Sequence, residues 1–130
     1  MIFELLSIHS IEHSPCKNAL GMEDHRIADE QITASSERSY VKAAFQGRLH
    51  LQETANTSGG WGAGVNDSNQ WLQIDLIGLY IKVTGVATQG RNGNYDEWVA
   101  KYKLQYSGDG VNFTYYREPG EKTDKVKSAR

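Results

Sequence analysis

The sequence predicts an all-β protein, built as an antiparallel sandwich or barrel. Residues 71–76 and 98–107 alternate in side-chain character with the period of two that is typical of half-buried strands. The turn Ser107-Gly108-Asp109-Gly110 then leads into another β-rich segment, as expected of a hairpin. No segment repeats the spacing of an amphipathic helix over three turns, and strands without helical crossovers favour antiparallel pairing.

Four strands are expected in the second half of the chain. In residues 71–76 (WLQIDL) the Leu and Ile side chains share one face, and Trp, Gln and Asp share the other. Residues 82–89 are β-branched around Gly85, which marks a bulge or a close backbone approach. Residues 98–107 and 111–116 form a hairpin, and no helix should exceed two turns. The side chains expected to be largely buried are Trp71, Leu72, Ile74, Val86, Leu104 and Tyr106.

The composition is that of one globular domain. The chain has 130 residues, 38% hydrophobic and 23% charged, which is enough to bury a core. Its formal net charge is -2 and its Lys and Arg residues are scattered, so it lacks the basic face that nucleic-acid binding requires. No apolar run approaches the roughly 18 residues of a membrane-spanning helix.

The N-terminal segment gives an ambiguous indication of the compartment. In residues 1–15, Glu4 interrupts the apolar run, and neither a basic start nor a small-residue cleavage site is present. We interpret this segment as a leader or a truncated signal. The single cysteine, Cys16, leaves two alternatives open, a buried free thiol in a cytosolic protein or a secreted domain whose second cysteine lies outside the chain.

Three sequons favour secretion. The candidate N-glycosylation sites are Asn56, Asn66 and Asn112, each followed two residues later by Ser or Thr. About one such motif is expected by chance for this asparagine content.

Three connections are long and polar: the first loop (residues 35–51), the second loop (residues 53–69) and the third loop (residues 89–97). The second is rich in Gly, Asn, Ser and Thr around Trp61, and the third is polar apart from one Tyr. Long loops on a rigid β frame commonly carry binding residues, although exposed connectors without a ligand fit the same pattern.

Motifs for catalysis or metal binding are incomplete. His9-Ser10-Ile11-Glu12-His13 has the H-x-x-E-H order of one zinc-peptidase class, but Pro15 follows closely and the remaining histidines are isolated. Gly60-Trp61-Gly62-Ala63-Gly64 lacks the Gly-Lys-Ser/Thr ending of a phosphate-binding loop. The sequence therefore predicts no enzyme, no metal ligand and no cofactor.

A series of separate motifs in fixed order identifies a family resemblance. The motifs are Cys16 with Ala19-Leu20-Gly21-Met22-Glu23, Ile27, Gln31-Ile32-Thr33-Ala34-Ser35-Ser36, Ala44, Arg48-Leu49, Gly60-Trp61, residues 66–76, residues 83–90, and Tyr102-Lys103-Leu104-Gln105-Tyr106-Ser107 with the hairpin to Tyr116. Over residues 16–118 the chain resembles the coagulation factor V/VIII type C domain, or discoidin domain, of the galactose-binding-like superfamily.

The resemblance implies a jelly-roll β-sandwich whose long loops meet at one end. It also implies that these loops cover the outer face of the first strand, so that Trp71 is buried and Gln73 and Asp75 bond loop backbone groups. Cys16, Trp61, Trp71, Gln73 and Asp75 would then have structural roles.

The chain departs from the family at its C-terminal end. Family members continue past the hairpin with further strands and a cysteine that pairs with the first. Here residues 119–130 form a charged tail instead, which leaves Cys16 without that partner. We therefore interpret residues 16–118 as an incomplete discoidin-type domain, lacking its C-terminal strands, from a larger multidomain secreted protein.

The resemblance further implies a non-catalytic extracellular module for cell adhesion or for recognition of a matrix protein or glycan. Tyr40 and Tyr95 would stack on a sugar ring, with neighbouring cationic and amide groups bonding its rim. The alternative is a peripheral membrane module that binds anionic phospholipid, with Tyr40 and Val41 inserted. The expected ligand-binding residues are Arg38, Ser39, Tyr40, Val41, Lys42, Arg91, Asn92, Asn94 and Tyr95.

Overall fold

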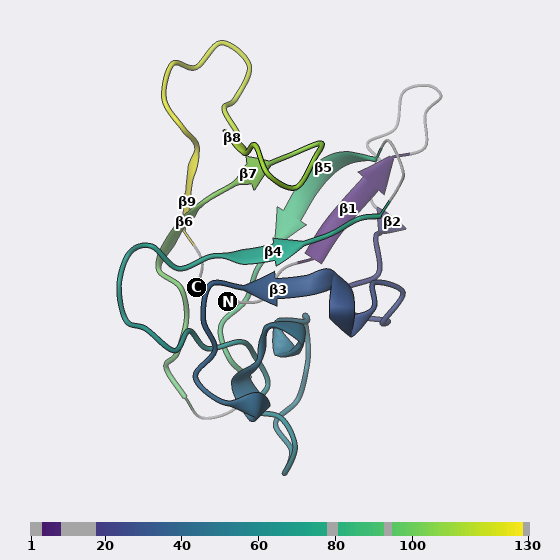
Figure 1. Cartoon of the computed structure of the whole chain (residues 1–130), viewed down its shortest axis with the longest axis vertical. Coiled ribbons are helices and arrows are strands. Elements are labelled where there is room, and N and C mark those ends of the chain that lie inside the picture. Colours follow the sequence, from purple (N-terminus) through teal and green to yellow (C-terminus); the bar gives the residue numbers. More distant parts are fainter. Residues whose placement is uncertain (1–3, 9–17, 78–80, 93–94, 129–130) are drawn as a thin grey trace.

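The structure is a computed structural model that describes residues 4–8, 18–77, 81–92 and 95–128 (Figure 1). Its regular elements within these ranges are short β strands and three-residue 3-10 helices. The expected all-β class and the absence of any helix longer than two turns are therefore confirmed for this part of the chain. None of the helices described there is long or apolar enough to span a membrane.

The two longest described strands, β1 (Glu4–Ile8) and β5 (Lys82–Ala87), belong to a three-stranded antiparallel sheet. β1 lies between β2 (Asn18–Ala19) and β5, as Figure 1 shows. The register of β1 against β5 shifts by one residue next to Gly85, so that one residue of β5 bulges out of the ladder. This confirms the irregularity expected at Gly85.

The core lies against a second, two-stranded ladder. η1 (Asp29–Gln31) leads into β3 (Ile32–Ala34), which pairs with β4 (Leu72–Ile74). The apolar face of β4 covers a cluster of buried side chains, as its alternating sequence predicts. The cluster consists of Met22, Ile27, Ile32, Ala44 and Trp61, bordered by Leu20, Ala34, Ala63, Leu72, Ile74 and Leu76.

The expected burial of Trp71 is wrong, since 48% of its side chain is exposed. The loop segments that carry Ala44 and Trp61 pack on the opposite face of β4, against Leu72 and Ile74. The loops thus bury the aliphatic face of this strand and leave the Trp71 face open.

The side chain of Asp75, expected to bond the long loops, forms a local hydrogen bond in the structure. Its Oδ1 accepts a hydrogen bond from the backbone N of Ile77, 2.9 Å away and two residues along the chain. Ile77 has a positive φ of 34°, so this local bond marks the turn that ends the strand segment.

Two further ladders form the C-terminal half. β7 (Gln105–Tyr106) pairs with β8 (Thr114–Tyr115), which confirms the hairpin. β6 (Lys101–Lys103) pairs with β9 (Val126–Ser128), so the charged segment after residue 118 contributes a strand. Tyr106 is 62% exposed, contrary to the expected burial, because β7 belongs to a two-stranded ladder and points this ring to solvent. Leu72, Ile74, Val86 and Leu104 are partly buried.

The described strands do not join into the two continuous sheets of a jelly roll. They form one three-stranded sheet and three two-stranded ladders. Most of these strands are only two or three residues long, which is too short to extend a ladder across a whole sheet.

Candidate functional site

The three long loops meet at the end of the molecule that lies below β3 and β4 in Figure 1. η2 (Tyr40–Lys42) and η3 (Ala44–Gln46) shape the first loop. The backbone N of Gly62, on the second loop, donates to Lys42 O at 3.0 Å, and Ser58 N donates to Val41 O at 2.9 Å. The first two loops are therefore held together by their main chains.

The third loop is attached to both of the others through side chains. Arg91 Nε donates to the carbonyl oxygen of Ser58 at 2.7 Å, and Asn92 Nδ2 donates to that of Leu51 at 2.9 Å. At the base of the loop, Gln89 Oε1 accepts a hydrogen bond from His50 N at 3.0 Å. These bonds connect the three loops in space although the sequence separates them widely.

The glycines of the second loop allow it to approach the first. A Cβ on Gly64 would lie 2.7 Å from the backbone oxygen of Glu37, and one on Gly62 would lie 2.9 Å from Lys42 Cδ. The contact at Gly64 is with backbone, which has little room to move, so no other residue fits there without a shift of the loop.

Trp61 and Ser36 anchor this contact to the core. Trp61 is 6% exposed, and its Nε1 donates to the carbonyl oxygen of Ser36 at 3.0 Å. Ser36 Oγ accepts hydrogen bonds from the backbone N atoms of Gly64 and Val65 at 3.0 and 3.2 Å. The position of the second loop is thus fixed by one buried ring and one hydroxyl.

Four charged side chains form a chain of ion pairs across all three loops. Lys42 Nζ lies 2.9 Å from Glu97 Oε2, Arg91 Nη1 lies 3.1 Å from the same oxygen, and Arg91 Nη2 lies 3.0 Å from Glu53 Oε1. The Lys42 and Arg91 side chains are only 16% and 12% exposed, so their charges are less screened than in a fully exposed pair. Glu97 is the shared partner of both cations.

Glu97 has a lowered pKa in this arrangement. The hydrogen bond from Lys42 is the largest cause of the shift from the ordinary value of 4.5; partial burial opposes it, and the hydrogen bond from Arg91 adds to it. A carboxylate whose pKa is depressed by folding contributes stability above its unfolded pKa, and this contribution is lost as pH falls through the folded value.

We therefore expect Glu97→Gln to unfold more easily than the unmodified protein at neutral pH, with a difference that shrinks as the pH falls below 4.5. Urea denaturation at neutral pH and in acid would measure this. Glu118→Gln is the matched control, because its pair with Lys125 lies outside the three loops. If the free energies of unfolding of Glu97→Gln and the unmodified protein differed by the same amount at every pH, the lowered pKa of Glu97 would be contradicted.

Two tyrosines stand at the surface of this loop cluster. The guanidinium of Arg91 lies 3.6 Å from the centre of the Tyr95 ring, and 49% of Tyr95 remains exposed. Tyr40 is 75% exposed and touches Phe45 edge-on, with 5.6 Å between ring centres. Each ring is held on one side by its own loop and open on the other.

A model of the F5/8 type C domain matches residues 31–129 of this chain. The chain belongs to the F5/8 type C domain family. It is 42% identical over 131 residues to lactadherin of Sus scrofa and 39% identical over 126 residues to coagulation factor V of the same species. It is also 41% identical over 122 residues to human EGF-like repeat and discoidin I-like domain-containing protein 3.

The alignments cover 95%, 93% and 88% of this chain but only 30%, 5% and 25% of those three proteins. The chain therefore spans less than a third of each of these relatives. F5/8 type C domains are non-catalytic binding modules, so this chain is a binding module and not an enzyme.

Within the F5/8 type C domain, the expected ligand-binding residues divide by what they contact. Lys42, Arg91 and Asn92 are engaged by groups of the same three loops. Arg38, Ser39, Tyr40 and Tyr95 are exposed, and Val41 is partly buried. Cys16, Asn94 and the His9–His13 motif lie outside the described residues.

Sequence reasoning missed Glu53 and Glu97, which organise the loops by binding Arg91. The signal that would have found them is the acidic content of these loops, since partly buried cations need nearby carboxylates. The sequence analysis assigned ligand binding to cations, amides and aromatic residues, and it gave the neighbouring carboxylates no role.

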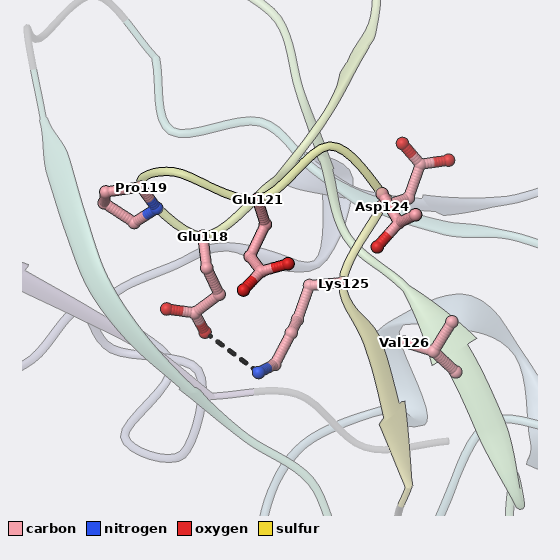
Figure 2. Close-up of a pocket in the computed structure, with 7 residues that line it drawn as sticks. Glu118, Pro119, Glu121, Asp124, Lys125 and Val126 are labelled. Carbon is pink, nitrogen blue, oxygen red and sulfur yellow. Dashed lines mark ion pairs between the residues drawn. The ribbon is translucent and has the colours of Figure 1, made fainter.

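A separate hollow of about 600 Å³ lies in the C-terminal segment of the domain. Figure 2 shows Glu118, Glu121 and Asp124 around it, with Lys125 paired to Glu118 at 3.2 Å. It is bordered by residues 118–126, at the end of the molecule opposite the three loops in Figure 1. Among the residues that the structure describes, no group of three or more His, Cys, Asp or Glu side chains is placed to hold a metal ion.

Proposed function

We propose that this domain is an extracellular adhesion module that recognises a glycan, or a matrix protein that bears one, at the end formed by the three loops. The observation that carries the proposal is the Tyr95 ring, which Arg91 supports on one face at 3.6 Å while half of the side chain stays open. An aromatic ring fixed in this way loses little conformational entropy when a flat apolar face, such as that of a sugar ring, stacks on it.

Charge favours an uncharged ligand over an anionic one. The three loops contain four Lys or Arg residues and five Asp or Glu residues. Lys42, Arg48 and Arg91 each pair with a carboxylate of the domain. Arg38 is the remaining cation, and it forms no ion pair within the described ranges. Attraction to an anionic bilayer is worth only about 1 kcal/mol for each such cation.

The wider setting of the domain belongs to the same proposal. Because the relatives are three or more times longer than the region they share with this chain, we propose that it acts within a larger multidomain protein. A jelly-roll sandwich is the fold we propose for the complete domain. Cys16 is the only cysteine in the 130 residues, so a disulfide at Cys16 would require a cysteine outside this chain.

We expect Tyr40→Ala and Tyr95→Ala each to weaken glycan binding by about 1 kcal/mol, roughly fivefold in Kd, because each removes one stacking surface. The thermal midpoint should change little, since Tyr40 is largely exposed and Tyr95 half-exposed. A glycan array identifies the best-bound sugar, and titration with that sugar gives the Kd. Tyr106→Ala is the control, because Tyr106 is 62% exposed but lies on β7.

Sedimentation with phosphatidylserine liposomes runs beside the glycan titration. Binding to these liposomes without binding to any glycan would favour the phospholipid alternative. Unchanged glycan binding in both tyrosine variants would place the site elsewhere on the domain, and loss of folding would make the two rings core residues.

A further inference from the structure

The asparagines of the three sequons differ in what they contact. Asn112 Nδ2 donates to Asp109 Oδ2 at 2.7 Å, and its backbone N donates to Asp109 Oδ1 at 2.8 Å. Asp109 also accepts hydrogen bonds from Val111 N and Ser107 Oγ. These bonds hold the pKa of Asp109 far below its ordinary range, and the bond from Asn112 N is the largest cause. All partners lie within six residues, so this turn can form before the rest of the chain folds.

Asn56 and Asn66 have no comparable engagement. Both residues are exposed, and neither side-chain amide has a hydrogen bond to the described part of the chain. Asn56 stands in the turn that Thr54 and Thr57 close with a backbone hydrogen bond of 2.9 Å. Asn66 follows Val65, whose backbone N is bound to Ser36 Oγ, so the position of Asn66 is fixed while its side-chain amide has no hydrogen bond to the described residues.

We propose that Asn56 and Asn66 are N-glycosylated and that Asn112 is not. The inference rests on the extracellular location proposed above. In the reaction, the Nδ2 atom of asparagine attacks the anomeric carbon of a sugar linked to a lipid pyrophosphate. The new N–C bond replaces the C–O bond to the pyrophosphate, which leaves as the lipid pyrophosphate, and Nδ2 loses one proton. The amide must be available for this step, and the local turn withholds only that of Asn112.

Both proposed glycans lie on the second loop, beside the candidate ligand site. The backbone of Gly64, two residues before Asn66, approaches that of Glu37 on the first loop. Ser58, two residues after Asn56, bonds Val41 and Arg91. Glycans at these positions would hold a flat surface such as a bilayer away from the loops, while a single sugar chain could still reach Tyr40 and Tyr95.

The test is expression of the full 130-residue chain behind a secretory leader in glycosylating cells. The leader delivers the chain to the glycosylating compartment, so the result does not depend on the natural location of the protein. Removal of glycans by an amidase in heavy-oxygen water converts each occupied Asn to labelled Asp, which fragment mass spectrometry locates. We expect label at Asn56 and Asn66 only. Asn56→Gln and Asn66→Gln should each remove one glycan, and Asn112→Gln should remove none.

Label at Asn112 would overturn the argument from the local turn. Absence of label at Asn56 or at Asn66 would overturn the assignment of that site. Neither result depends on whether the domain binds a glycan, so failure here is distinct from failure of the proposed function.

Discussion

Trp61→Ala is expected to lower the free energy of unfolding by about 3–5 kcal/mol, the range for removing a buried large aromatic side chain. Trp61 is 6% exposed and packs with Met22, Ile27, Ile32 and Ala44. The substitution also leaves the carbonyl oxygen of Ser36 without the indole donor. Because a small domain has only about 5–15 kcal/mol of stability, this single change can remove most of it.

The chain contains its own controls for this prediction. Trp71 and Trp98 are 48% and 50% exposed, so their replacement by Ala should cost much less, about 1 kcal/mol each. Trp61→Phe keeps most of the ring volume but loses the N–H donor. Its loss of unfolding free energy should lie between that of Trp61→Ala and those of the two exposed-site variants. Urea denaturation followed by far-UV circular dichroism compares these four variants with the unmodified protein without relying on tryptophan fluorescence. Equal losses at Trp61 and Trp71 would contradict the core described above.

The strands that the sequence predicted correctly are those whose pattern is local. Alternation in residues 71–76 and the turn at residues 107–110 depend only on neighbouring residues, and both are present in the structure. Alternation also separates the Leu72 face from the Trp71 face correctly. It does not say which face the loops cover. Trp71 was expected to be buried because the family resemblance implies that the loops cover its face, whereas here they cover the Leu72 face.

The loop contacts were harder to predict because they join residues far apart in the sequence. Lys42 and Glu97 are separated by 55 positions, and no periodicity links them. Their partial burial is what makes the pairing necessary, and burial in a loop cannot be inferred from spacing. β9 was missed for a related reason, since Val126–Ser128 has no apolar alternation and gains its conformation from pairing with β6.

Arg48 holds the segment before β3 to the first loop, although its charge would suggest an exposed side chain. The side chain is 2% exposed; Nη1 donates to the carbonyl oxygen of Met22 at 2.7 Å, and Nη2 lies 2.5 Å from Asp29 Oδ1. Met22 is itself fully buried, so water is poorly placed to replace the guanidinium at its carbonyl group. The guanidinium therefore acts as a buried cross-link between the first loop and the segment that precedes β3.

Arg48→Ala is expected to lower the free energy of unfolding by about 3–4 kcal/mol, because it creates a cavity and leaves a buried carbonyl group unpaired. Arg48→Met should recover part of this loss by filling the volume. The Nε atom has no partner within the described residues, so its removal adds no cost.

Arg26→Ala is the matched control for Arg48→Ala. Arg26 also binds a backbone oxygen, that of Ala19, and an aspartate, Asp24, but its side chain is 61% exposed. It should cost far less, since water can take over both hydrogen bonds. Urea denaturation of the three variants measures the difference, and a loss at Arg48 no larger than that at Arg26 would show that burial does not strengthen this cross-link.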